Sequence, residues 1–365
     1  TVQRVRTLDH ALEAVARRSV RALDPPVRAA LRVGAYQLAF MDGIAPHAAV
    51  NESVELVRRA GLERAVPFAN AVLRRLAGEI RDLVAALPEG TPAEAALKHS
   101  YPDWIAAIWW GEHGRDGALA LMEAQNGPPE TVVRVTERAG SLPGRPAQDF
   151  PRALHLEHVP EEWIEQGLVW PQSRGSQLAG LAVGARQGER VLDLCAAPGG
   201  KATQLAEVAA EVVAVEKHPG RARELARNAA RLGARNVEVV NADALELPPA
   251  LQDFDRALVD APCSGLGVLA ARPDLRWRAE PLPELQLSLL RAAIGRVKRG
   301  GTVTYAACTL HAAENEDVVD AVGAEVEDLG AEWPSFRHPR RPEFLLTLPH
   351  VHGTAGFFVA RMRLS

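Results

Sequence analysis

The second half of this sequence repeats one arrangement, a short β-rich run followed by a loop and then a helical segment. Helical segments at residues 219–232 and 285–297 separate several of these runs. Strands that alternate with helices pack as a parallel sheet with helices on both faces. The arrangement therefore predicts an α/β fold. The β-rich runs lie at residues 191–194, 212–215, 237–240, 257–259 and 302–305.

The first part of the chain follows a helical pattern instead. Leu73, Leu76 and Ile80 recur at a spacing of three or four residues, which is typical of one apolar helix face. No alternating strand pattern competes with it. Residues 1–88 are therefore predicted to form an all-helical domain.

A mixed segment, residues 89–170, follows the helical domain. Its pattern is helical near residues 104–123 and strand-like at 131–135, and the proline- and glycine-rich stretch 140–152 is predicted to be a loop. We therefore predict a small α+β connector here. The α/β domain then covers residues 171–365.

Composition and charge narrow the class of protein. A chain of 365 residues, 47% hydrophobic and 24% charged, suits two or three folded domains, and we find neither a membrane-spanning apolar run nor a signal peptide. Three cysteines cannot close a disulfide framework, which indicates a reducing, cytoplasmic location. The net charge of the whole chain is −4. Residues 1–88 carry 13 Lys and Arg and 9 Asp and Glu, a net charge of +4, so the rest of the chain has a net charge of −8. The net charge therefore does not exclude a nucleic-acid partner, because phosphates would meet the local charge of the helical domain.

A glycine-rich loop, DLCAAPGGK at residues 193–201, follows one β-rich run and opens a helix. Small residues there let backbone N–H groups approach a ligand. Glu216 ends the next strand, where an acid commonly accepts hydrogen bonds from ribose hydroxyls, and Asp243 follows the third strand on the adenine side. The loop is neither a G-x-G-x-x-G nor a Walker A sequence, so S-adenosylmethionine is favoured and a nicotinamide oxidoreductase ranks last.

Two of the cysteines follow later strands. Cys263 lies in the motif DAPCSG at residues 260–265, directly after the fourth β-rich run, and Cys308 follows the last β-rich run. Because the carboxyl ends of parallel strands share one edge, both cysteines are predicted beside the cofactor. A thiolate can add to carbon 6 of cytosine and leave again, which activates carbon 5 for methylation, and Asp260 suits the charge that builds at nitrogen 3. The residues alone do not say which cysteine is the nucleophile.

These motifs resemble the RsmB/Fmu/Sun family of 16S rRNA (cytosine-5) methyltransferases, which carry an N-terminal NusB-like domain. The resemblance implies a Rossmann-like S-adenosylmethionine-dependent domain with a mostly parallel seven-stranded sheet. An all-helical NusB-like RNA-binding domain and a small α+β connector precede it. The matching stretches are residues 31–38, 46–52, 70–75, 195–201, 260–265, 272–274, 277, 305–310 and 314–316.

The resemblance also assigns roles to residues. Cys308 matches the nucleophile, Cys263 matches the cysteine that helps to break the covalent enzyme–RNA adduct, and Asp260 and Lys201 complete the predicted catalytic set. No metal site and no obligate protein partner is predicted. The implied substrate is 16S rRNA, naked or partly assembled into the small subunit. The predicted S-adenosylmethionine contacts are Cys195, Ala196, Ala197, Pro198, Gly199, Gly200, Lys201, Glu216, Asp243 and Asp260.

Three features depart from the family's pattern. Ala306 and Ala307 stand where the family usually has small hydroxyl residues, and Ala355 stands where it has an aspartate. The chain begins at Thr1, which suggests a trimmed N-terminus. Two other functions stay open: cytosine-5 methylation at another rRNA or tRNA site, and a non-catalytic NusB-like RNA-binding or assembly factor.

Overall fold

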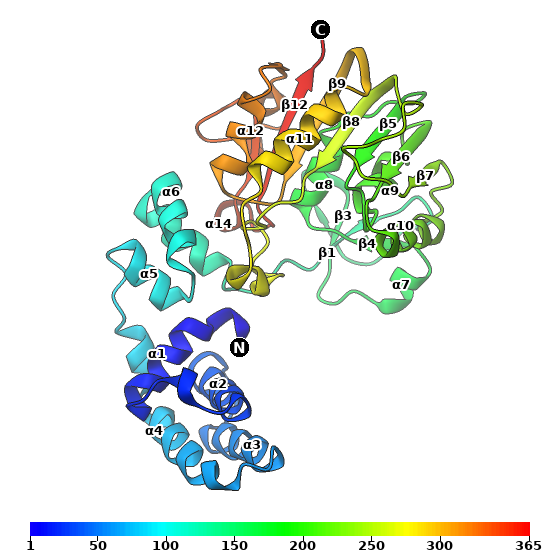
Figure 1. Cartoon of the computed structure of the whole chain (residues 1–365). Coiled ribbons are helices and arrows are strands. Elements are labelled where there is room, and N and C mark those ends of the chain that lie inside the picture. Colours follow the sequence, from blue (N-terminus) through cyan, green and yellow to red (C-terminus); the bar gives the residue numbers. More distant parts are fainter. The chain divides into compact units, whose positions relative to one another are not determined.

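The computed structural model describes residues 1–365, which divide into two compact units, Thr1–Asn126 and Gly127–Ser365. The first unit runs from blue to cyan in Figure 1, and the second runs from green to red. Each unit has a hydrophobic core of its own. The domain boundaries expected near residues 88 and 170 stay predictions.

The first unit is entirely helical, which confirms the helices predicted for residues 1–88 and near 104–123. Prolines stand in the first turn of several of its helices, where the missing N–H has no helical partner to lose. The α-helices are α1 (Val5–Ala16), α2 (Pro25–Phe40), α3 (Pro46–Arg59), α4 (Val66–Ala85), α5 (Pro92–His99) and α6 (Asp103–Ala124), and the 3-10 helices are Val2–Arg4, Val20–Ala22 and Glu63–Ala65.

Helices α2, α3 and α4 pack closely around a shared apolar core. Leu31 and Leu73 are fully buried in it. Gly34 of α2 lies so close to its neighbours that an added Cβ would meet Ser53 Oγ at 2.7 Å and a Leu73 methyl carbon at 2.8 Å. Glycine at this position therefore permits the close approach of the three helices.

A small antiparallel sheet with strand order β2-β3-β1-β4 begins the second unit. The strand expected at residues 131–135 is confirmed as β1 (Val132–Val135). The loop expected over 140–152 is wrong in part, because β2 (Arg145–Ala147) and the start of β3 (Phe150–His155) lie there. Pro146 is tolerated because β2 is an edge strand and its register shifts beside this residue. The remaining elements here are α7 (Glu161–Glu165) and β4 (Val169–Pro171).

The large sheet has strand order β10-β12-β9-β8-β5-β6-β7, and β11 pairs with β12 as an eighth strand. The five strands from β9 to β7 are mutually parallel, whereas β12 runs antiparallel to β9. The mostly parallel Rossmann-like sheet is thus confirmed, but it has eight strands where seven were predicted, because the short strands β10 and β11 both pair with β12. Its strands are β5 (Arg190–Leu194), β6 (Glu211–Val215), β7 (Val237–Val240), β8 (Phe254–Asp260), β9 (Val297–Ala307), β10 (Glu325–Val326), β11 (Leu345–Thr347) and β12 (Phe357–Arg363).

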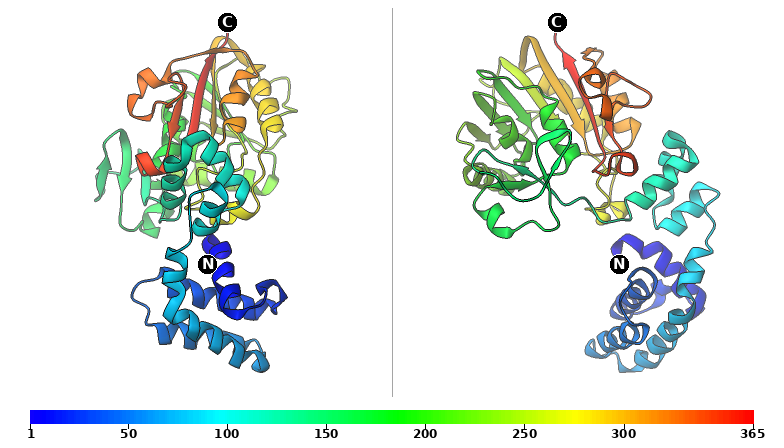
Figure 2. Two further views of the ribbon diagram at one scale, coloured as in Figure 1. Left: turned by 90° about the vertical axis from the view of Figure 1, so that its left-hand side faces the viewer. Right: turned by 180° about the vertical axis from the view of Figure 1, so that it is seen from behind.

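The strand order reverses between β5 and β8. The chain moves outward from β5 to β6 and β7, and then crosses to β8 on the other side of β5. Right-handed crossovers place α9 and α10 on one face of the sheet and α11 on the other (Figure 2). Ligands of such folds bind at the carboxyl ends of the strands beside this reversal. The helices are α8 (Arg174–Leu181), α9 (Gly200–Leu205), α10 (Pro219–Leu232), α11 (Pro283–Ile294), α12 (Glu316–Asp320), α13 (Leu329–Glu332) and α14 (Pro349–His352).

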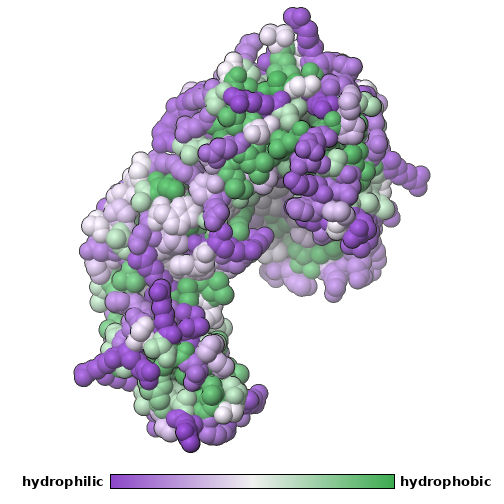
Figure 3. All heavy atoms as spheres, in the orientation of Figure 1, coloured by the Kyte–Doolittle hydropathy of each residue, from purple (hydrophilic) through white to green (hydrophobic).

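Hydrophilic side chains cover much of the face shown in Figure 3, with hydrophobic ones interspersed among them. No helix combines the length and the apolar character needed to cross a bilayer. Two of the exposed large hydrophobic side chains, Leu245 and Leu285, line the cavity described next.

Candidate active site

A cavity of about 640 Å³ lies at the carboxyl edge of the parallel strands. This volume is within the range of about 300–1,000 Å³ typical of small-molecule sites. The loops after β5, β6, β7, β8 and β9 all contribute to its wall. The predicted site residues that line it are Cys195, Ala197, Glu216, Asp243, Asp260, Cys263 and Cys308.

The glycine-rich loop turns sharply at the end of β5. Cys195 and Gly199 have φ angles of 63° and 109°, and the peptide bond between Ala197 and Pro198 is cis. An added Cβ at Gly199 would meet a Leu225 methyl carbon at 2.6 Å, so only glycine fits this turn against α10. The turn therefore brings Cys195 and Ala197 to the wall of the cavity.

Helix α10 holds the same loop from outside. Arg221 donates a hydrogen bond of 2.8 Å to the carbonyl of Ala197, and Asn228 donates one of 2.8 Å to that of Pro198. Arg221 also lines the cavity, as do Lys217 and His218. These three residues are not predicted from the sequence, although their position just after Glu216 is a signal that could identify them.

Two acids stand at the ends of the next strands. The Glu216 side chain is 4% exposed, and its Oε1 accepts the His218 N–H at 2.8 Å. Asp243 pairs with Lys217 at 2.7 Å, and the hydrogen bond with Lys217 lowers the pKa of the Asp243 carboxyl. Both residues line the cavity, so their carboxylate oxygens can accept hydrogen bonds from a bound ligand.

Lys201 points to Asp260. Its Nζ donates a hydrogen bond of 2.6 Å to Asp260 Oδ2 and lies 5.0 Å from the centre of the Phe357 ring. Lys201 is not among the residues that line the cavity, and neither are Ala196, Pro198, Gly199 and Gly200. Asp260 thus lines the cavity while its other side contacts a buried lysine.

The sulfurs of Cys263 and Cys308 lie 3.3 Å apart, and both residues line the cavity. Their mutual hydrogen bond lowers the pKa of the Cys308 thiol and raises that of Cys263. Burial raises the pKa of Cys195 to about 12. Cys308 is therefore the cysteine best suited to act as a thiolate, and all three cysteines are free.

The residues that depart from the family's pattern bring no polar side chain of their own. Ala306 and Ala307 are fully buried at the end of β9. The backbone carbonyl of Ala355 accepts a hydrogen bond of 2.7 Å from Thr347 Oγ1. The loop that carries Cys308 is held instead by hydrogen bonds of the residues that follow it, which are described below.

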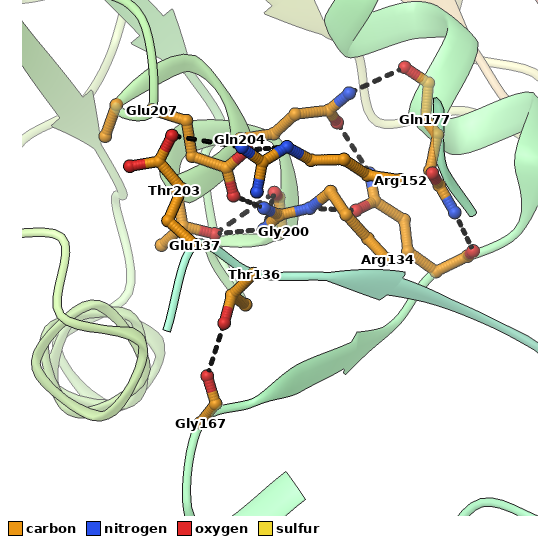
Figure 4. A network of polar contacts seen from close by, with 12 residues as sticks. Arg134, Thr136, Glu137, Arg152, Gly167, Gln177, Gly200, Thr203, Gln204 and Glu207 are labelled. Carbon is orange, nitrogen blue, oxygen red and sulfur yellow. Dashed lines mark hydrogen bonds and ion pairs between the residues drawn. The ribbon is translucent and has the colours of Figure 1, made fainter. Parts of the chain in front are cut away.

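A buried network supports α9 from the small sheet (Figure 4). Arg134 of β1 is 1% exposed and forms an ion pair with Glu207. It also donates hydrogen bonds of 2.8 Å to Thr203 Oγ1 and 3.3 Å to the carbonyl of Gly200. One guanidinium thus joins the small sheet to the helix that begins at the glycine-rich loop.

Replacing Arg134 by leucine should lower the free energy of unfolding by about 3–5 kcal/mol, because it leaves the Glu207 carboxylate, whose side chain is only 16% exposed, without its main partner. Urea unfolding measures this loss. Arg152 is the matched control, since it also faces Glu207, at 3.6 Å, but its side chain is 41% exposed. Arg152→Leu should cost about 1 kcal/mol or less, and equal losses in the two variants would contradict the prediction.

The fold and the site together define a class. The sheet is mostly parallel, its glycine-rich loop lacks a phosphate-binding fingerprint, and an acid stands at the end of the next strand. This combination is typical of the Rossmann-like methyltransferases that use S-adenosylmethionine. The chain belongs to the RsmB/F family of 16S rRNA methyltransferases, whose family model matches residues 181–363. A NusB-family model matches residues 1–78. The family predicted from the motifs is thus confirmed.

Individual relatives agree with this assignment. The chain is 31% identical to a probable ribosomal RNA small subunit methyltransferase B of Bacillus subtilis, over 100% of this chain and 88% of that protein. It is 34% identical to ribosomal RNA small subunit methyltransferase B of Thermus thermophilus, over 99% and 86%. The crystal structure of PH0851 shares the fold with a TM-score of 0.79 and 24% identity, over 99% of this chain and 87% of that chain.

Proposed function

We propose that this chain methylates carbon 5 of a cytidine in 16S rRNA through a covalent bond between Cys308 and the cytosine ring. The contact of two sulfurs at 3.3 Å in the cavity, beside Asp260, is the observation that carries the proposal. Carbon 5 of cytosine is a poor nucleophile, and a thiolate that adds to carbon 6 activates it. The family membership supports a 16S rRNA substrate, which would place the enzyme in the cytoplasm.

The residues then divide the chemistry between them. The Cys308 thiolate adds to carbon 6 while Asp260, as a carboxylic acid, donates a proton to nitrogen 3, and Lys201 pairs with the carboxylate that is left. Nitrogen 3 returns this proton to Asp260 when the aromatic ring is restored. S-adenosylmethionine supplies the methyl group when it is bound. A base removes the proton at carbon 5, the carbon 6–sulfur bond breaks, and the electron pair returns to Cys308 as a thiolate. Cys263 assists this departure by donating a hydrogen bond to the leaving sulfur.

The cavity fits the adenosine part of the cofactor. We assign the ribose hydroxyls to Glu216, whose buried carboxylate has acceptor capacity beyond one backbone N–H and an ion pair with Arg221 at 3.6 Å. Asp243 follows the next parallel strand and suits the adenine side. The predicted loop residues 195–201 would complete the site through their backbone.

Glu216→Gln should weaken S-adenosylmethionine binding. A hydrogen bond to a charged acceptor contributes about 1.5–3 kcal/mol, which is about ten- to a hundredfold in Kd. Isothermal titration calorimetry measures it. Glu211→Gln, at the opposite end of the same strand, is the matched control and should leave the Kd unchanged. An unchanged Kd in Glu216→Gln would contradict the assignment.

The helical unit offers a basic surface for the RNA backbone. Arg18 and Arg64 line a hollow of about 260 Å³ with Phe68, and Arg18 lies over the Phe68 ring at 5.7 Å. In contrast, Arg58 and Arg59 are both paired with Glu55. We assign phosphate contacts to the first pair, which agrees with the positive charge of this part of the chain.

The proposal is tested by methyl transfer from labelled S-adenosylmethionine to naked 16S rRNA, to small-subunit particles and to tRNA. Label should appear as 5-methylcytidine in 16S rRNA, and the same position should lose its modification in cells without the gene. Label that appears only in another RNA would identify that RNA, and not 16S rRNA, as the substrate. Absence of S-adenosylmethionine binding would favour the non-catalytic RNA-binding factor.

A further inference from the structure

A buried carboxylate lies behind the two cysteines. Glu314 ends the 3-10 helix Ala312–Glu314 and is fully buried. Its Oε1 accepts from the N–H of Ser264 at 2.9 Å, the N–H of Leu282 at 3.1 Å and the amide of Gln286 at 3.0 Å. Its Oε2 meets the hydroxyls of Ser264 and, at 3.1 Å, Thr309. Five donors thus compensate the burial of one charge.

These donors belong to both cysteine loops. Ser264 directly follows Cys263, and Thr309 directly follows Cys308. The two hydroxyls are 2.8 Å apart, so they and the carboxylate form one closed cluster. Gln286 extends it, because the same amide donates to the carbonyl of Pro262 at 2.9 Å. The two cysteines are 45 residues apart in sequence, and Glu314 bonds to both of their loops. The loops also meet directly, because the N–H of Gly267 donates a hydrogen bond of 2.9 Å to the carbonyl of Cys308.

We propose that Glu314 is a positioning residue that holds the loops of Cys263 and Cys308 together, so that the two sulfurs stay in contact. The inference rests on the proposed roles of these cysteines in the reaction. Glu314 bonds to Ser264 and Thr309 rather than to the sulfurs, so it acts on the two cysteines through these neighbours.

The charge of Glu314 also favours the protonated form of Cys263. It adds to the causes that raise the pKa of Cys263, after the hydrogen bond with Cys308 and burial. The charges of Asp260 and Lys201 also act on the Cys308 thiol, where Asp260 raises the pKa and Lys201 lowers it. A protonated Cys263 can donate to Cys308, which keeps Cys308 as the nucleophile.

Disulfide trapping measures this geometry without requiring activity. Diamide accepts the two electrons and two protons of a thiol pair, and peptide mass mapping of the full chain identifies a bond between Cys263 and Cys308. The native pair should cross-link rapidly, because the sulfurs are already 3.3 Å apart. Glu314→Ala should slow this reaction by about tenfold or more, since the loops lose their shared anchor.

Glu314→Gln separates positioning from charge. Its carboxamide oxygen can take the place of Oε1, and its NH₂ can donate to the two hydroxyls, which accept as well as donate. Cross-linking should therefore stay within about twofold of the native rate, and methyl transfer should recover relative to Glu314→Ala. The matched control is Glu316→Ala, another buried carboxylate, whose partners are His338 at 2.9 Å and Arg340 at 3.3 Å. It should cross-link at the native rate.

The outcomes are distinct. Native-rate cross-linking in Glu314→Ala, or equal slowing in Glu316→Ala, would overturn the positioning role. If Glu314→Ala does not fold, Thr309→Val replaces it, because this variant removes one tie of the Cys308 loop at nearly constant volume, and an unchanged rate there would also overturn the role. A native protein that methylates no RNA defeats the proposed function but leaves the trapping result interpretable.

Discussion

Replacing Cys308 by serine should abolish methyl transfer to RNA. The serine hydroxyl has nearly the same place and size, but it is not ionised at neutral pH and adds poorly to carbon 6 of cytosine. In the native protein the hydrogen bond from Cys263 lowers the pKa of Cys308, so the variant loses a thiolate that the site favours. We expect initial rates with labelled S-adenosylmethionine to fall by at least about 10³-fold, as the loss of a nucleophile does in other enzymes.

The Cys308→Ser substitution should lower the rate of methyl transfer but not the affinity for S-adenosylmethionine. Cys308 follows β9 and lines the cavity, but the predicted ribose and adenine contacts lie after β6 and β7. The Kd for S-adenosylmethionine, measured by calorimetry, should therefore stay within about twofold of the native value. Full transfer activity in Cys308→Ser would show that the nucleophile is a different group.

The sequence predicts the helices and strands whose capping residues and apolar spacing favour the same structure as their packing in the fold. The helix expected at 219–232 is α10 with the same ends, because Pro219 suits its first turn and Gly233 adopts the left-handed conformation after its last. Strands β2 and β3 were not predicted, because their proline- and glycine-rich sequence forms strands only through pairing with neighbours.

The sequence predicts which residues gather at the site, but it does not predict the contacts between their side chains. Cys195, Asp260 and Cys308 were placed at one edge because the carboxyl ends of parallel strands meet there. The contact between the sulfurs of Cys263 and Cys308 depends on side-chain hydrogen bonds between loops, such as those of Glu314, and no local spacing encodes these. The order of the two cysteines likewise came from the family resemblance alone.

Replacing Cys263 by serine should leave the enzyme covalently attached to its RNA. The nucleophile remains in this variant, so addition to carbon 6 and methyl transfer can take place once. Release then requires the carbon 6–sulfur bond to break beside Cys263, whose sulfur lies 3.3 Å from that of Cys308. A serine hydroxyl is a poorer proton source for this step than a thiol, because its pKa is far higher.

A denaturing gel with end-labelled 16S rRNA measures the trapped species. We expect a protein–RNA band in Cys263→Ser that approaches one RNA per protein and needs S-adenosylmethionine to reach its full amount. The double variant with Cys308→Ser should give no band, because the attached sulfur is then missing. Multiple turnover by Cys263→Ser without any band would contradict the assignment. A band that survives in the double variant would reassign the covalent bond to another side chain, for which Cys195 is the only remaining thiol.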